Sequence, residues 1–378
     1  PRDAAAAAAD TPAPRPAAPG ELPVVRALYV NRFAAQSKAK MRHLVGIADS
    51  TEINALVIDM KDEFGLNYSS RTPAFARNAG TMTKVADVKA LLDTLEAHDV
   101  LAIARIVVFK DSVTARVNPQ WTIRKTDDSI WRDHKGLAWV NPYHRELWEY
   151  NIGVAEELVK MGFDEIQFDY IRFPEPYRSL PQQVFPGNGG QPKPEAIAEF
   201  LKTANARLDK FGVRTTADIF GLVTTVKGPL EVAQEWEKLA PVTDVLLPMT
   251  YPSHYPRGSF GVARPNAEPY RIMYAAIARA HERDAKLGIG GEHVRPWIQA
   301  FTLGAPAYGP TEITEQKRAI YDAGYDGWVL WNPGSKYDIF VPAFEKTLVS
   351  RKKPFRGAAP AAAPKATAAR PDSSAPKP

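Results

Sequence analysis

The sequence predicts one α/β domain, a (β/α)8 TIM barrel. Between residues 23 and 350, short β-rich runs alternate with helical patterns, which is typical of βα units around a parallel sheet. Eight such runs are present, and the length of the segment suits a barrel. Polar side chains recur at the carboxyl end of these runs, where barrel enzymes carry their chemistry.

Each expected strand is bounded by loop residues, and helical spacing of apolar residues separates one strand from the next. The expected strands are 24–30, 55–60, 101–109, 165–171, 213–220, 244–249, 294–301 and 327–331. The clearest helices are expected at 144–161, 194–211, 229–240, 269–284 and 311–323, with a closing segment at 337–350. Gly162 and Gly212 follow two of these helices, as C-caps do.

Residues 162–174 hold the most informative strand. Alternation places Glu165, Gln167 and Asp169 on one face and apolar residues on the other. A polar row is unusual for a buried parallel strand, and it fits a face that points into a barrel. A solvent-facing edge strand is the alternative interpretation.

The bulk composition limits the class of protein. The formal charge of +5 equals the excess carried by residues 352–378, so the remainder is close to neutral and no nucleic-acid surface is expected. No cysteine is present, which excludes disulfides and thiolate chemistry. No apolar run reaches the ~18–20 residues of a membrane span.

The termini differ in composition from the barrel segment. Residues 1–22 are rich in Ala and Pro, and residues 351–378 are rich in Ala, Pro and Lys. Both are expected to be disordered tethers outside the 23–350 domain. Together with a first residue that is not Met, they suggest an exported protein, periplasmic, envelope-associated or extracellular, whose signal peptide has been removed.

A doubly wound open sheet is the alternative fold. Such folds that bind dinucleotides carry a Gly-rich phosphate loop after the first strand. Here Asn31, Arg32 and Phe33 stand in that place, which favours the barrel and predicts no nucleotide cofactor.

Converging carboxylates, arginines and aromatic rings at one end of a barrel are typical of a saccharide site. Sugars offer hydroxyl groups to charged side chains and C–H faces to aromatic rings. The residues expected at that end are Asp59, Lys61, Arg105, Asp169, Arg172, Asp218, Tyr251, His254, Gln299, Trp331 and Asn332. Asp169 and Asp218 are the predicted catalytic residues, and the other nine are predicted to bind substrate.

Asp169 and Asp218 end adjacent strands at matching depth, and glycoside hydrolysis needs two carboxylates. Arg105, on the neighbouring strand, is expected to keep Asp169 ionised. Less charged surroundings would raise the pKa of Asp218 and suit it to act as the acid. Structural hydrogen bonding inside the barrel is the alternative role for both.

Other candidates keep two interpretations. Asp59 is either a transition-state or sugar ligand, or a buried partner of Lys61 or Arg105. Glu165 lies one layer deeper than Asp169 and is expected to be structural. His254 is either a substrate ligand or an exposed loop residue. A metal held by Asp59, Asp169 and Asp218 is an alternative, but no His spacing supports zinc, and no metal or cofactor is predicted.

Several motifs carry a family resemblance. They are 57–62 (VIDMKD), 103–111 (IARIVVFKD), 139–143 (WVNPY), 162–174, 217–221 (ADIFG), 248–255 (PMTYPSHY) and 328–333 (WVLWNP). Over about residues 24–345 the chain resembles a bacterial family proposed to be glycoside hydrolases, long classed as a domain of unknown function and distantly similar to α-amylase-type barrels.

The resemblance to amylase-type barrels implies roles for two residues. There, a nucleophilic Asp ends strand four, an Arg lies two residues before it, and a Glu acid/base ends strand five. By analogy, Asp169 is the nucleophile and Asp218 the acid/base. Residue 167 is Gln rather than Arg, Asp replaces Glu at 218, and Gln299 stands where a third acid is expected.

The sequence therefore predicts a glycosidase that cleaves a polysaccharide or oligosaccharide, and the resemblance suggests an α-linked one. Two other functions remain open: a non-catalytic carbohydrate-binding barrel of the cell envelope, and a metal-dependent hydrolase. Fold alone does not separate them.

Overall fold

The chain folds into a closed barrel of eight parallel strands. The computed structural model describes residues 23–357. The barrel closes because β1 (Arg26–Val30) pairs with β2 (Ala55–Asp62) on one side and with β9 (Trp328–Trp331) on the other. Between them lie β4 (Leu101–Val107), β5 (Glu165–Asp169), β6 (Arg214–Phe220), β7 (Val245–Met249) and β8 (Trp297–Gln299). The predicted TIM barrel is confirmed.

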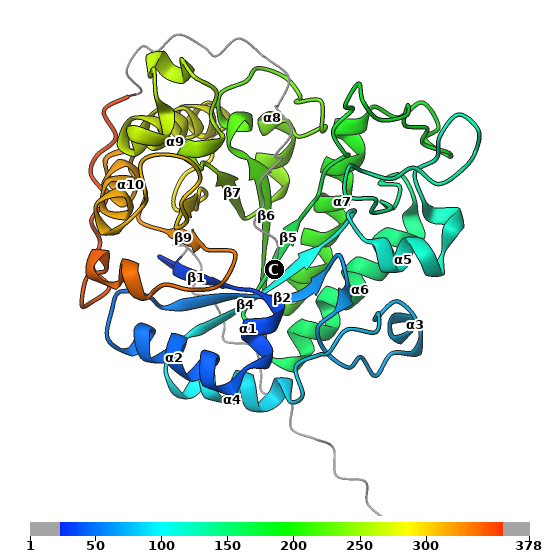
Figure 1. Cartoon of the computed structure of the whole chain (residues 1–378), viewed down its shortest axis with the longest axis horizontal. Coiled ribbons are helices and arrows are strands. Elements are labelled where there is room, and N and C mark those ends of the chain that lie inside the picture. Colours follow the sequence, from blue (N-terminus) through cyan, green and yellow to red (C-terminus); the bar gives the residue numbers. More distant parts are fainter. Residues whose placement is uncertain (1–22, 358–378) are drawn as a thin grey trace, which may run out of the picture.

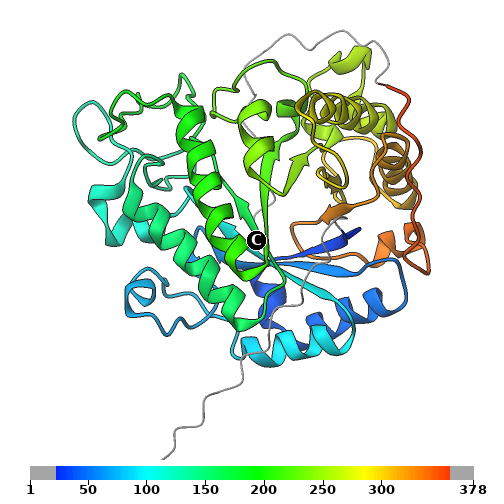
Figure 2. The same ribbon diagram turned by 180° about the vertical axis from the view of Figure 1, so that it is seen from behind.

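Helices surround the strands. Figure 1 shows the strands at the centre with the longer helices around them, and Figure 2 shows the same arrangement from behind. The longer helices are α2 (Lys38–Asp49), α4 (Val88–Ala97), α6 (Arg145–Met161), α7 (Lys193–Leu208), α9 (Pro269–Leu287) and α10 (Pro310–Asp322). The shorter ones are α1 (Arg32–Gln36), α3 (Pro73–Ala76), α5 (Ser112–Val117) and α8 (Trp236–Leu239). No helix within residues 23–357 is both long and apolar enough to cross a membrane.

One predicted strand and one predicted helix are shorter in the structure, and one short strand was not predicted. The strand expected at 294–301 is only Trp297–Gln299, with an isolated bridge at Val294, because Pro296 has no N–H to donate. The helix expected at 229–240 shrinks to α8, because Ala233 takes a positive φ of 69°. A short antiparallel strand, β3 (Gly65–Leu66), extends β2 and was not predicted.

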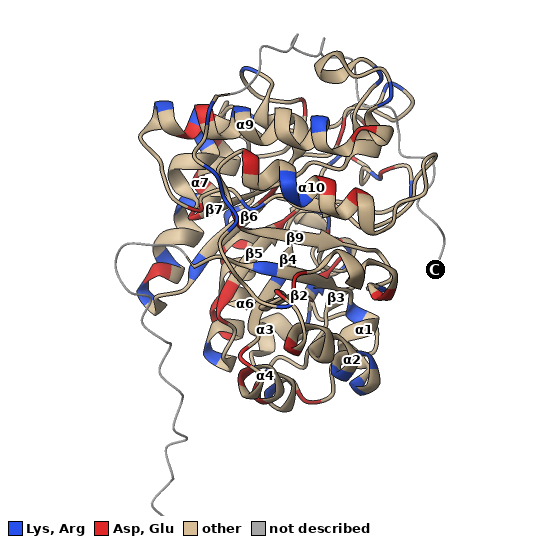
Figure 3. Cartoon of the chain, turned by 90° about the vertical axis from the view of Figure 1, so that its left-hand side faces the viewer, with Lys and Arg blue, Asp and Glu red and all other residues tan. Residues whose placement is uncertain are grey.

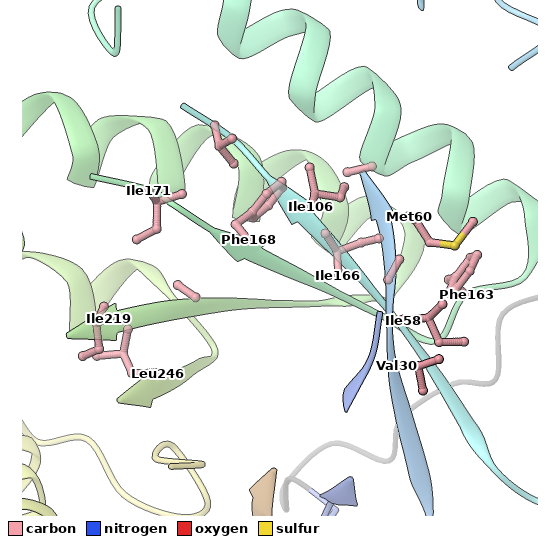
Figure 4. Packing of buried hydrophobic residues seen from close by; sticks show 14 of the residues in the cluster. Val30, Ile58, Met60, Ile106, Phe163, Ile166, Phe168, Ile171, Ile219 and Leu246 are labelled. Atoms are coloured by element: carbon pink, nitrogen blue, oxygen red, sulfur yellow. The ribbon is translucent and has the colours of Figure 1, made fainter. Parts of the chain in front are cut away.

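The barrel wall separates two kinds of packing. Ile106, Ile166 and Phe168 project from β4 and β5 toward the helices and belong to the large outer core (Figure 4). A second apolar cluster fills part of the barrel interior, with residues such as Ala27, Val57, Ile103, Leu247 and Val329. The interior also holds the polar row of β5, as the alternation predicted.

The base of the barrel, at the amino ends of the strands, holds buried ion pairs. Glu165 faces Arg295 at 2.6 Å and Arg214 at 3.8 Å. These contacts fit the structural role expected for Glu165. On the outer layer, acidic and basic residues are interspersed along α9 and α10 (Figure 3).

The described chain continues past the predicted domain boundary at residue 350. Lys352 pairs with Glu292 at 3.0 Å, and Lys353 pairs with Asp322 at 2.6 Å. Phe355 stacks on His281 of α9 at 4.1 Å. Residues 351–357, the start of the tether predicted at 351–378, therefore lie against the barrel. The tether predicted at 1–22 and the remainder of the C-terminal one, 358–378, lie outside the described residues.

Candidate active site

A sharp bend after β5 positions Asp169 at the mouth, the carboxyl end of the strands. Tyr170 takes a positive φ of 51°, which is rare for a residue with a large side chain. Its backbone N–H donates a hydrogen bond back to Asp169 Oδ1 at 2.5 Å. Because the bend follows the carboxylate directly, it fixes where Asp169 points.

One guanidinium serves three carboxylates at the mouth. Arg105 on β4 contacts Asp59 at 2.5 Å and forms an ion pair with Asp169. Its Nε lies 3.7 Å from Asp218 Oδ2. Burial disfavours the charge of Arg105, but attraction from Asp59 and Asp169 outweighs burial and raises the pKa of Arg105 above its ordinary value. Three acids facing one cation leave the cluster with surplus negative charge unless it binds protons.

Asp218 is the acid best placed to hold such a proton. The residue is 1% exposed. Burial raises the pKa of Asp218 well above its ordinary value, and the Asp169 carboxylate raises it further. Asp218 Oδ1 accepts hydrogen bonds from Gln167 and Trp297, both at 2.7 Å, whereas Oδ2 is buried without a hydrogen-bond partner. Of the two carboxylate oxygens, Oδ2 is therefore the one that the fold leaves without a hydrogen bond, on the side that faces Arg105.

Asp59 lies on the other side of Arg105. The hydroxyl of Tyr29 donates a hydrogen bond to Asp59 Oδ2 at 2.5 Å, and the Tyr29 ring lies 5.5 Å from the Arg105 guanidinium. Burial raises the pKa of Asp59, while Arg105 and Tyr29 oppose that rise. Asp59 is thus a buried partner of Arg105, one of the two roles that the sequence left open, and Lys61 takes no part.

Aromatic rings form one wall of the mouth. Trp331 at the end of β9 is half-buried and lies 6.0 Å from Tyr29, 5.7 Å from Tyr251 and 5.3 Å from Phe301. His254 is exposed at the rim, 5.4 Å from the Tyr251 ring. Burial raises the pKa of Tyr251, and the charges of Asp218 and Asp169 raise it further, so this wall borders the two carboxylates.

The structure does not bring Lys61 to this cluster. The β2–β4 register shifts between Asp59 and Lys61, so simple alternation fails there. Lys61 is fully buried, pairs with Asp111 at 2.7 Å and lies 5.6 Å from the ring of Tyr150 on α6. These contacts place Lys61 between the barrel wall and the helices.

Arg172 supports the loop after β5. It pairs with Glu175 at 3.1 Å and packs between the rings of Trp139, Tyr170 and Phe220, at 4.7 to 5.1 Å. Because Tyr170 directly follows Asp169, Arg172 acts on the cluster through that neighbour.

Gln299 and Asn332 lie at the mouth with their side-chain amides engaged. Gln299 is fully buried and accepts a hydrogen bond from Ser253 N at 3.0 Å. Asn332 donates to Ala300 O at 2.6 Å and accepts from Gly334 N at 3.0 Å. Both amides hold loops in place.

Within residues 23–357, no group of three His, Cys, Asp or Glu side chains is arranged to hold a metal ion. Asp59, Asp169 and Asp218 converge instead on the guanidinium of Arg105. A positive side chain thus occupies the place between the acids.

Comparison with known families agrees with this geometry. Residues 27–337 match the family model described as "Putative glycosyl hydrolase domain". The chain belongs to this family. No curated protein sequence matches the chain.

Several solved structures are similar to this family member. A hypothetical protein from Ruminiclostridium thermocellum ATCC 27405 is 37% identical over 50% of this chain and 96% of its own, with a TM-score of 0.46. The PgaB (BpsB) glycoside hydrolase domain from Bordetella bronchiseptica is 14% identical over 85% of this chain and 98% of its own, with a TM-score of 0.61. The spore cortex-lytic enzyme SleL from Bacillus megaterium QM B1551 is 11% identical over 88% of this chain and 76% of its own, with a TM-score of 0.51. At these identities, the last two show a shared fold.

This family member lacks the arginine of amylase-type barrels at position 167, but a neighbouring strand supplies one. Arg105 on β4 is the register partner of Gln167 on β5. Its guanidinium contacts Asp169, while Gln167 holds Asp218 instead. Arg105 thus reaches Asp169 from the neighbouring strand, at the depth of Gln167.

Sequence reasoning missed two residues of the cluster, Tyr29 and Trp297. Tyr29 contacts Asp59, and Trp297 contacts Asp218. Both lie on inward faces of predicted strands, Tyr29 two residues after Ala27 and Trp297 two before Gln299. Alternation along those strands was the signal that could have found them.

Proposed function

We propose that this protein hydrolyses glycosidic bonds of a polysaccharide at the mouth of the barrel. Asp169 is the nucleophile, and Asp218 is the acid and then the base. The observation that carries the proposal is the contrast between two neighbouring acids: Asp169 in a close ion pair with Arg105, and Asp218 with a raised pKa and an Oδ2 that has no hydrogen-bond partner.

The chemistry follows from these positions. Asp218 donates its proton to the glycosidic oxygen while Asp169 bonds to the anomeric carbon, and the bond to the leaving sugar breaks. Asp218, now a carboxylate, removes a proton from water. That water displaces Asp169 from the anomeric carbon and releases the second product.

The strand register supports retention of configuration. Phe168 on β5 is opposite Ala217 on β6, so the next step along both strands brings Asp169 opposite Asp218. Neighbouring strands lie about 4.8 Å apart. Both carboxylates also face the same guanidinium of Arg105, which favours the shorter carboxyl separation of retaining enzymes, about 5–5.5 Å, over the about 6.5–9.5 Å of inverting ones.

The aromatic wall supports a sugar substrate. Trp331 offers a half-buried ring beside the two acids, and Tyr251 and Phe301 brace it. The resemblance to amylase-type barrels favours an α-linked polysaccharide, so the panel below compares both linkages.

The test is release of reducing ends from a panel of α- and β-linked bacterial and plant polysaccharides. We expect wild type to cleave one class of substrate, and Asp169→Asn, folded as judged by its melting curve, to cleave none. Equal activity in the variant would contradict the role of Asp169. Binding without turnover in both proteins would identify a carbohydrate-binding barrel, and loss of activity with chelator would identify a metal-dependent hydrolase.

The stereochemistry gives a second test. NMR of the first product should show the same anomeric configuration as the bond that was cleaved. Inversion would rule out Asp169 as a nucleophile while leaving hydrolysis intact.

We also propose that the protein is exported, which the Ala/Pro-rich terminal segments support. Immunodetection in cell fractions of the native host should find it outside the cytoplasm. Recovery only with the cytoplasm would contradict export.

A further inference from the structure

A cavity lies beside the aromatic wall, in the segment that follows β7. Its volume is about 340 Å³, and its lining includes Ser253, Tyr255, Arg257, Arg264 and Asn266. The segment starts from Tyr251, whose ring lies 5.7 Å from Trp331. Two of its lining residues, Ser253 and Asn266, are hydrogen-bonded to Gln299 at the mouth, which connects the cavity to the proposed catalytic end of the barrel.

The cavity walls are tied to the barrel by a buried amide. Gln299 on β8 accepts a hydrogen bond from Ser253 N at 3.0 Å and donates one to Asn266 Oδ1 at 3.3 Å. Asn266 in turn donates to the carbonyl oxygens of Leu303 and Ala305, both at 3.1 Å. The walls are thus held in place by the protein itself, which reduces the ordering cost of binding a ligand.

Two positive charges of this cavity are not compensated. Arg257 and Arg264 both line it and are exposed. Neither side chain is among the hydrogen bonds or ion pairs of residues 23–357. The nearby acid Glu268 pairs with Arg271 instead, at 2.6 Å. Two guanidinium groups beside one cavity offer planar, bidentate hydrogen bonding to an oxyanion.

We propose that this cavity is a subsite for an acidic sugar of the substrate, whose carboxylate, sulfate or phosphate group binds Arg257 and Arg264. The identity of the ligand as a glycan rests on the proposed function. The anionic group is excluded from the catalytic centre, because Asp59, Asp169 and Asp218 already outnumber Arg105 there. The glycan therefore binds with a neutral sugar at the two acids and an acidic sugar beside Arg257 and Arg264.

Calorimetric binding tests this subsite separately from hydrolysis. The probes are matched pairs that differ in charge: oligogalacturonates with their methyl esters, sulfated with unsulfated galactan oligosaccharides, and phosphorylated with unphosphorylated malto-oligosaccharides. All titrations use the full chain carrying Asp169→Asn, which prevents turnover. We expect the acidic member of at least one pair to bind about tenfold more tightly, and that preference to weaken as salt is raised.

Charge variants locate the preference. Arg257→Gln/Arg264→Gln should abolish it, and Arg257→Lys/Arg264→Lys should retain part of it, because lysine keeps the charge without the planar fork. Arg42→Gln/Arg77→Gln removes two exposed arginines that flank β2, on the opposite side of the eight-strand ring from β7, and should leave the preference unchanged.

Equal affinity for both members of every pair, no binding of any acidic member, or a preference that survives Arg257→Gln/Arg264→Gln would overturn the subsite. These outcomes are distinct from failure of the proposed function. Hydrolysis of a neutral glycan without charge preference would support the proposed function and contradict the acidic-sugar subsite. A charge preference lost in the double variant, without hydrolysis by wild type, supports the subsite in a binding barrel.

Discussion

The base and the mouth of the barrel both contain buried charges. Arginines outnumber carboxylates at the base, whereas carboxylates outnumber arginines at the mouth. At the base, Glu165 lies between two arginines, bidentate to Arg295 at 2.6 and 3.2 Å and 3.8 Å from Arg214. At the mouth, Arg105 alone faces three carboxylates. The two clusters lie at opposite ends of the same strands.

This difference in charge balance assigns a structural role to the base and a chemical role to the mouth. The acid at the base lies between two cations and ties β5, β6 and the segment before β8 together. The acids at the mouth have too few, so burial and mutual repulsion raise the pKa of Asp218. Surplus negative charge also stabilises the positive charge that develops on the sugar in glycoside hydrolysis. Substitutions at the two ends should therefore fail in different ways.

Arg105→Gln should have the largest effect. It leaves the three carboxylates without a cation, so we expect the rate of hydrolysis to fall about a thousandfold and the free energy of unfolding to fall by ~3–5 kcal/mol. Arg105→Lys keeps the charge and should lose less of both. Initial rates and urea unfolding measure the two effects, and wild-type rates in Arg105→Gln would remove the guanidinium from the mechanism.

Glu165→Gln should affect stability alone. Arg295 and Arg214 lose their buried partner, so the free energy of unfolding should fall by ~3–5 kcal/mol, while the rate per folded molecule stays at the wild-type value. A double-mutant cycle with Arg295→Gln should show coupling, because the two side chains share hydrogen bonds. A rate loss as large as that of Arg105→Gln would erase the contrast between base and mouth.

Asp218→Asn should stabilise the protein at neutral pH while removing activity. In wild type, the folded protein keeps a proton on Asp218 at pH values where the unfolded chain, with a pKa of about 3.9, has released it. Folding stability contributed by this group therefore falls as pH rises from the unfolded toward the folded pKa. Asn does not titrate, so the free energy of unfolding of Asp218→Asn should decline less than that of wild type as pH rises from the unfolded toward the folded pKa of Asp218.

Urea unfolding of wild type and Asp218→Asn at a series of pH values measures this difference. The Glu165→Gln variant is the control and should keep the wild-type decline. Parallel pH profiles for wild type and Asp218→Asn would show that Asp218 is not protonated in the fold.

Trp331→Ala should have the smallest effect. It removes the half-buried ring of the sugar-facing wall, so KM should rise about tenfold, which corresponds to an aromatic contact of about 1.4 kcal/mol, with little change in kcat. Trp331→Phe should recover most of the affinity. Unchanged KM in Trp331→Ala would place the sugar elsewhere.

Much of the mouth could be predicted because period-two alternation is local. It placed Glu165, Gln167 and Asp169 on one inward face, and it identified Arg105 as the neighbour of Asp169 before any contact was known. The eight strands followed from the same kind of pattern, since each is a short apolar run between helical segments.

Prediction failed where contacts depend on irregular backbone or on register between strands. Lys61 does not point into the mouth because the β2–β4 register shifts after Asp59. The alternation pattern of β2 alone does not reveal such a shift. Tyr29 and Trp297 contact Asp59 and Asp218 across distances in sequence of 30 and 79 residues. β8 is short because Pro296 has no N–H to donate to the strand ladder, and an apolar run alone does not show this.

The protonation state of Asp218 tests the central claim most directly, because it needs no knowledge of the substrate. Carbon-13 NMR of protein labelled at the aspartate side-chain carboxyl carbon, compared with Asp218→Asn, identifies the signal of Asp218. We predict a signal, absent from the variant, that stays protonated well above the ordinary aspartate pKa of about 3.9. An Asp218 signal that titrates at or below that value would show that Asp218 is ionised at neutral pH. The mouth would then be a structural ion-pair cluster like the base.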